Sequence, residues 1–124
     1  MERIRFIEHR GNRVLFIDMT DCTPDEVGKV ADLVPPYVTK EQPGSVLLLA
    51  DFTGTKLTRD AVERIKVAAV FNRPHLKRSA WVGTPNGANA LREAVETFSV
   101  REIPSFTTRE EALEFLVARS GALA

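Results

Sequence analysis

Hydrophobic residues along the chain fall into short strand-like runs and into stripes at helical spacing. Residues 3–7 alternate charge with hydrophobe, as an edge strand with one wet face does, whereas residues 14–17 are continuously apolar. The Gly11-Asn12 pair between these runs tolerates positive φ and so predicts a β-hairpin. Residues 46–49 have the unalternating character of a strand covered on both faces. Residues 79–82 and a short run at 103–106 predict two further strands.

Capping residues and apolar stripes predict four helices. Thr23-Pro24-Asp25-Glu26 combines an N-cap threonine, a proline at the first helical position and a glutamate that completes a capping box. We expect Pro35-Pro36 to stop or kink this helix, because proline removes backbone donors. The predicted caps of the three later helices are Thr58, Thr84 and Thr108.

The resulting element order is ββαβαβαβα, which is that of an α/β protein. Alternating strands and helices imply a mixed, mostly parallel sheet, and right-handed crossovers place the helices mainly on one face if strand order follows the sequence. The 124 residues fit one domain, 1–124, and the chain carries no long repeat, low-complexity tract or linker.

Charge and composition narrow the partners that we expect. Seventeen basic residues balance seventeen acidic ones, so no net field favours nucleic acid or an anionic membrane. The charged N-terminus lacks the apolar core of a secretion signal, and no run approaches the ~18 apolar residues of a membrane span. We therefore expect a cytoplasmic protein without stable membrane insertion. Cys22 is the only cysteine, which excludes an intrachain disulfide and a multi-cysteine zinc site.

The segment DFTGTKLT, residues 51–58, resembles the string around the phosphoryl-accepting aspartate of haloacid-dehalogenase-like phosphatases. Those enzymes hold Mg²⁺ with further acidic residues, but no aspartate follows Asp60 in this sequence. We therefore predict no catalytic residue, no metal site and no cofactor. Asp51 and Thr53 are interpreted as turn residues whose side chains bond to nearby amides, and Gly54 as a position that needs permissive backbone.

Taken in order, the hairpin, the strand that ends in Leu-Leu-Ala-Asp51-Phe52-Thr53-Gly54-Thr55, the strand that ends in Val82-Gly83 and the closing segment 106–112 resemble the STAS-like/SEC14-like family. These proteins are relatives of SpoIIAA-type anti-sigma-factor antagonists, and the resemblance covers nearly the whole chain. In the antagonists a serine or threonine early in the helix after the third strand is phosphorylated. The matching position falls at or near Asp60, which cannot be phosphorylated in this way, and Thr58 is interpreted as an N-cap.

A second strand-to-helix junction, residues 83–87, has free amides that could hold an anion, but Pro85 removes one donor and simple capping is the preferred interpretation. Ligands of open α/β sheets collect at the carboxyl ends of the strands, where this loop and residues 51–58 could meet. The candidate ligand- or partner-binding residues are Asp51, Thr53, Gly54, Thr55, Thr58, Asp60, Gly83, Thr84, Asn86 and Gly87.

Two functional hypotheses follow. The first is a non-enzymatic STAS-like regulatory module that binds a protein partner, with a homodimer through the sheet edge or the sparsely covered face as one form of it. The alternative is a SEC14-like carrier or sensor of a small molecule, a lipid or an anionic ligand, in which we expect a shallow groove. His9, His75 and Cys22 fall on different connections, and Trp81 is expected in the core.

Overall fold

The computed structural model describes residues 3–83 and 104–118. In chain order these residues form β1 (Ile4–His9), β2 (Asn12–Asp18), α1 (Pro24–Val38), β3 (Val46–Asp51), α2 (Arg59–Asn72), the 3₁₀ turn η1 (Arg73–His75), β4 (Leu76–Val82), β5 (Ser105–Phe106) and α4 (Arg109–Val117). The helix predicted to begin at Thr84 lies outside the described residues.

The described strands form one mixed sheet in the order β1-β2-β3-β4-β5. β1 and β2 are antiparallel, while the β2–β3, β3–β4 and β4–β5 pairs are parallel. The predicted mixed and mostly parallel sheet, with strands in sequence order, is confirmed. β1 is the edge strand that the alternating pattern indicated, and all six residues of β3 are buried.

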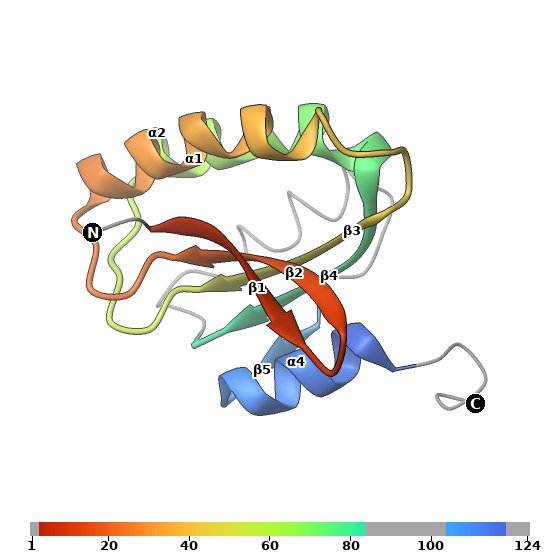
Figure 1. The fold of residues 1–124 in the computed structure, drawn as a ribbon. Coiled ribbons are helices and arrows are strands. Elements are labelled where there is room, and N and C mark those ends of the chain that lie inside the picture. The colour runs from red at the N-terminus through yellow and green to blue at the C-terminus, as the bar shows by residue number, and fades with distance from the viewer. Residues whose placement is uncertain (1–2, 84–103, 119–124) are drawn as a thin grey trace.

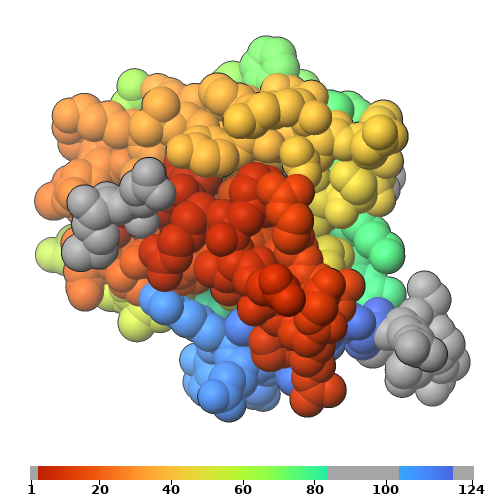
Figure 2. Space-filling view, viewed as in Figure 1, coloured from red at the N-terminus to blue at the C-terminus, as the bar shows by residue number. Residues whose placement is uncertain are grey.

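Helices cover both faces of the sheet (Figure 1). α1 and α2 pack side by side on one face, whereas α4 lies on the other, below the sheet in Figure 2. Ala112 and Leu116 of α4 are buried in a second core cluster with Val14, Phe16 and Leu49. The expectation of helices on one face thus holds for the crossovers α1 and α2. α4 differs because it follows the last strand and is free to fold under the sheet.

Of the predicted effects of Pro35-Pro36, a stop or a kink of the first helix, the stop is wrong. α1 contains both prolines and continues to Val38. Val34 and Val38 are both buried in the main core, so packing favours one more helical turn. The backbone N–H and the hydroxyl of Thr39 both donate to the carbonyl of Pro35, at 2.8 and 2.9 Å. These bonds close the helix end just after the prolines.

Most predicted caps and one predicted turn are present, with small differences. Thr23 and Glu26 form the reciprocal capping box. The hydroxyl of Thr108 accepts from the backbone N–H of Glu111 at 3.2 Å. The hairpin turn uses Arg10 and Gly11, with φ of 50° and 78°, rather than Gly11 and Asn12. Among the described residues, no helix has the length and apolar character needed to cross a membrane.

Candidate functional site

Two aspartates lie next to each other at the carboxyl end of the sheet. Asp18 ends β2 and Asp51 ends β3, and the parallel register pairs them directly. Each carboxylate is held by the threonine two residues later through its Oδ1 atom. Thr20 donates its N–H and its hydroxyl to Asp18 at 3.0 and 2.6 Å, and Thr53 does the same to Asp51 at 3.0 and 2.7 Å. The same side-chain turn is therefore built twice, on neighbouring strands.

Arg109, in the first turn of α4, joins this pair from the far side of the sheet. Its Nε lies 2.6 Å from Oδ2 of Asp51, and its Nη2 lies 4.0 Å from Oδ1 of Asp18. The guanidinium carbon also sits 4.6 Å from the centre of the Phe16 ring. Since Asp51 is only 3% exposed, its charge is compensated by a partner that comes from a distant helix.

These contacts determine what the carboxylates can do. Both oxygens of Asp51 are engaged, one by Thr53 and the other by Arg109. Burial raises the pKa of Asp18, but the hydroxyl and amide of Thr20 and the charges of Arg109 and Arg3 outweigh it, so the pKa is lowered overall. Both carboxylates act as hydrogen-bond acceptors that fasten the strand ends. An anionic ligand at this edge would compete with them for Arg109.

Four other predicted residues lie at the same edge. Thr55 is buried, and its hydroxyl donates to the carbonyl of Met19 and accepts from the N–H of Cys22 at 3.4 Å. Gly54 has φ of 73°, and a Cβ atom there would overlap Oδ1 of Asp21. A Cβ atom on Gly83 would contact the side chain and backbone of Thr53. The ends of β3 and β4 thus bring together five predicted residues: Asp51, Thr53, Gly54, Thr55 and Gly83.

The remaining predicted residues lie at the start of α2 or outside the described part of the chain. Thr58 caps α2 by accepting from the N–H of Ala61 at 3.2 Å, as interpreted from the sequence. Asp60 lies exposed in the first turn of α2. Three predicted residues lie outside the described part of the chain: Thr84, Asn86 and Gly87.

Sequence reasoning missed Asp18 and Arg109. A signal for Asp18 was present, because Asp18-Met19-Thr20 repeats the Asp51-Phe52-Thr53 pattern at the end of the preceding strand. No comparable local signal marks Arg109, which is separated from Asp51 by 58 positions. Within the described residues, no group of three His, Cys, Asp or Glu side chains is arranged to hold a metal ion.

The two histidines each contact a polar atom of another residue, and the single cysteine is buried. Nδ1 of His75 lies 2.8 Å from the carbonyl oxygen of Glu41, which holds this half-buried side chain in place. Nε2 of His9 lies 3.2 Å from Glu114. Cys22 is buried, which raises the pKa of its thiol. Trp81 is 4% exposed, as expected for a core residue.

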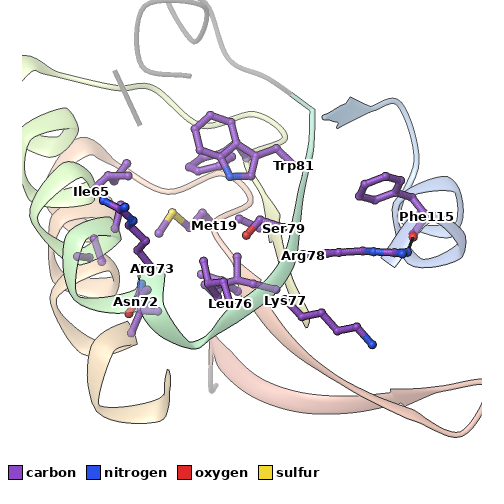
Figure 3. Close-up of a pocket in the computed structure, with 18 residues that line it drawn as sticks. Met19, Ile65, Asn72, Arg73, Leu76, Lys77, Arg78, Ser79, Trp81 and Phe115 are labelled. Atoms are coloured by element: carbon purple, nitrogen blue, oxygen red, sulfur yellow. Dashed lines mark hydrogen bonds between the residues drawn. The ribbon is translucent and has the colours of Figure 1, made fainter. Parts of the chain in front are cut away.

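A cavity of about 170 Å³ lies between α2 and the face of the sheet that α2 covers (Figure 3). Its walls are mostly apolar and include Met19, Phe52, Ile65 and Trp81. Asn72, the last residue of α2, also lines it, and this side chain is buried with no hydrogen-bond partner for its Oδ1. No sequence pattern indicated this cavity, because from the sequence alone Asn72 is recognisable only as the end of a helix.

The outer side of α2 carries an exposed apolar surface, formed by Val67, Val70 and Phe71. These side chains are 57%, 50% and 59% exposed, and their spacing places them on one face of the helix. We call this set the α2 surface. A groove of about 440 Å³ separates Val67 and Phe71 from Pro35 and Pro36 of α1.

Comparison with known proteins identifies the architecture. No protein-family model matches the sequence, and no curated protein matches it significantly. The structure is similar to the crystal structure of an uncharacterized protein of the DUF3478 family from Shewanella loihica PV-4, which is described as having a SpoIIAA-like fold. The TM-score is 0.66 at 16% sequence identity, and the match covers 91% of each chain. The chain therefore has a SpoIIAA-like fold, as its resemblance to the STAS-like proteins implied.

Proposed function

We propose that this chain is a non-enzymatic interaction module that binds a protein partner through the α2 surface. The observation that carries the proposal is the exposure of Val67, Val70 and Phe71, each by half or more, on one helix face. Contiguous exposed apolar side chains on a soluble domain commonly mark a binding surface. The groove beside Phe71 offers a recess for an apolar side chain of the partner.

The contacts at the strand ends support a role without catalysis. A carboxylate nucleophile needs an oxygen that can approach the substrate, whereas both oxygens of Asp51 are hydrogen-bonded and the residue is buried. Metal-dependent turnover of phosphate esters by the purified protein, abolished in Asp51→Asn, would overturn this assignment.

Position in the fold also supports α2 as the interacting element. The resemblance to the antagonists places their phosphorylated residue early in this helix, at or near Asp60. Here Asp60 is exposed and already negative, and Thr58 uses its hydroxyl to cap the helix. We infer a partner interface at α2 that is not switched by phosphorylation at the matching position.

Affinity capture with mass spectrometry tests the proposal. The tagged protein should retain a protein partner at near-stoichiometric amounts through washing, and light scattering of the purified chain should decide whether a second copy is that partner. Capture without any such partner, together with a monomer at every concentration, would count against the proposal.

The second candidate function is binding of a small molecule, in the manner of a carrier or sensor. The observation that favours it is the cavity beneath α2, rather than the loops at residues 51–58 and 83–87. With about 170 Å³ the cavity is smaller than the ~300 Å³ of a typical drug-sized site, so it suits a compound of few heavy atoms. Thermal-shift panels should detect stabilisation by small compounds; the absence of any shift would argue against this candidate.

A further inference from the structure

The Oδ1 atom of Asn72 is the only buried side-chain oxygen or nitrogen in the described residues that lacks a hydrogen-bond partner. The residue is 6% exposed, so bulk water does not compensate the atom. Buried polar groups of native proteins nearly always have partners, and each exception calls for an explanation. Asn72 lines the cavity beneath α2, which is where a partner could enter.

The cavity sets the size and polarity of that partner. An apolar cavity of roughly 150 Å³ in another protein takes up benzene, so the 170 Å³ here suits a ring-sized compound. Met19, Phe52 and Ile65 supply apolar walls, and Figure 3 shows Met19 and Ile65 on the same side of Trp81. The body of the compound should therefore be a hydrocarbon ring or a branched chain of similar size.

The polar residues around the cavity define the rest of the chemistry. An amide Oδ1 only accepts hydrogen bonds, so the compound must carry a donor. Arg73 also lines the cavity, and its positive charge disfavours an ammonium group, whereas the side chains of Lys77 and Arg78 extend away from the cavity (Figure 3). A neutral hydroxyl satisfies both conditions.

We propose that the cavity beneath α2 binds a neutral, ring-sized compound whose hydroxyl donates to Oδ1 of Asn72. This inference rests on the second candidate function and assigns its ligand class and its recognition residue. It is independent of a protein interface on the outer side of α2. The hydrogen bond pairs the Asn72 oxygen, while the apolar walls contact the ring.

Two probes of similar shape isolate the hydroxyl: cyclohexanol carries it and methylcyclohexane does not. Trp81 reports binding of both, because it lines the cavity and is the only tryptophan of the chain. The dissociation constant of each probe is measured by Trp81 fluorescence in the native protein and in Asn72→Leu, which keeps the side-chain size and removes the acceptor. Asn12→Leu, at the exposed hairpin, is the matched control.

We expect the native protein and Asn12→Leu to have the same ratio of the two dissociation constants. In Asn72→Leu the ratio should move against cyclohexanol by about three- to tenfold, which is the effect of losing one hydrogen bond. If Asn72→Leu does not fold, Ala68→Leu, which fills the cavity from α2, should abolish binding of cyclohexanol.

The contrary outcomes are distinct. An unchanged ratio in Asn72→Leu, or undiminished binding in Ala68→Leu, would overturn the assignment of Asn72 or of the cavity while leaving small-molecule binding itself in place. If neither probe alters Trp81 fluorescence up to its solubility limit, the inference and the second candidate function both fail.

Discussion

The Nε atom of Arg109 lies 2.6 Å from Oδ2 of Asp51, and this contact joins the first turn of α4 to the end of β3. The carboxylate side chain is 4% exposed and the arginine 45%, so a buried charge is neutralised by a partner that is half in solvent. Asp51 thereby fastens α4 to the end of β3. Its position at the strand end has a structural explanation that needs no catalytic role.

Removing the guanidinium should therefore destabilise the fold. We expect Arg109→Met to lower the free energy of unfolding by about 1–3 kcal/mol, because the buried Asp51 carboxylate loses its charged donor. Arg13→Met is the matched control, since Arg13 also pairs with a carboxylate, Glu41, and also lies over a phenylalanine ring. Glu41 is more exposed than Asp51, so this loss should be at most about 1 kcal/mol.

Denaturant melts measure both variants, and a double-mutant cycle with Asp51→Asn isolates the pair. The effects of Arg109→Met and Asp51→Asn should not add, because either change breaks the same contact. Additive effects, or equal losses of stability in Arg109→Met and Arg13→Met, would contradict the stabilising role of the contact between Arg109 and Asp51.

Stability should also depend on acid through Asp18. Because the pKa of Asp18 is lowered in the folded protein, its ionised form contributes stability that is fully present above the unfolded pKa of about 4. That contribution is lost as the pH falls through the folded pKa. Asp18→Asn should flatten the decline of the unfolding free energy below about pH 4. A parallel decline in Asp18→Asn and the native protein, in melts from neutral pH downward, would exclude this role.

Substitution by alanine at three glycines with positive φ should destabilise the fold to different degrees, according to the atoms that surround each glycine. Gly44, Gly54 and Gly83 have φ of 66°, 73° and 61°, so alanine strains the backbone similarly at each. A new Cβ meets nothing within 4 Å at Gly44, the Asp21 side chain at Gly54, and both the side chain and the backbone of Thr53 at Gly83.

Since Asp21 can rotate and backbone cannot, the loss of stability should increase from Gly44→Ala through Gly54→Ala to Gly83→Ala. Thermal melts of the three variants give the order. Equal losses at all three positions would mean that the close approach of the strand-end loops has no energetic weight.

Thr58→Ala should cost about 0.5–2 kcal/mol by removing the N-cap of α2. The hydroxyl accepts from the N–H of Ala61 at 3.2 Å, and alanine leaves that donor without its acceptor. Thr58→Ser keeps the acceptor and serves as the control in denaturant melts. An unchanged midpoint for Thr58→Ala would contradict the cap and leave the Thr58 hydroxyl available for modification.

Local signals in the sequence account for the parts of the fold that were predicted. The continuous apolar run at residues 46–49 is β3, and the threonines at 23, 58 and 108 are helix caps, because such patterns act within one or two turns of chain. The end of α1 was mispredicted where local chemistry and packing disagree. Pro35-Pro36 disfavours the helix, but burial of Val38 extends it.

At the strand-end site, only the contact between residues close together in the chain was predicted. Asp51 was correctly interpreted as a turn residue that bonds to a nearby amide, whereas the Thr53 hydroxyl donates to the Asp51 carboxylate rather than bonding to an amide. Arg109 could not be assigned, because its contact depends on where α4 packs under the sheet. The same holds for Asn72, whose unpartnered oxygen exists only because helix, strand and cavity walls meet around it.

Docking of a protein partner on the α2 surface, as proposed above, is tested most directly by comparing Phe71→Ser with Glu8→Ser. Both residues are exposed, so either change should leave the unfolding free energy within about 0.5 kcal/mol. Phe71 lies on the α2 surface, whereas Glu8 lies on the exposed β1 edge. The measurement is the dissociation constant of the captured partner for each variant.

We predict that Phe71→Ser weakens binding at least about tenfold, as loss of an aromatic anchor does, and that Glu8→Ser leaves it unchanged. Native affinity in Phe71→Ser would contradict docking on the α2 surface, and a loss confined to Glu8→Ser would place the interface at the sheet edge instead.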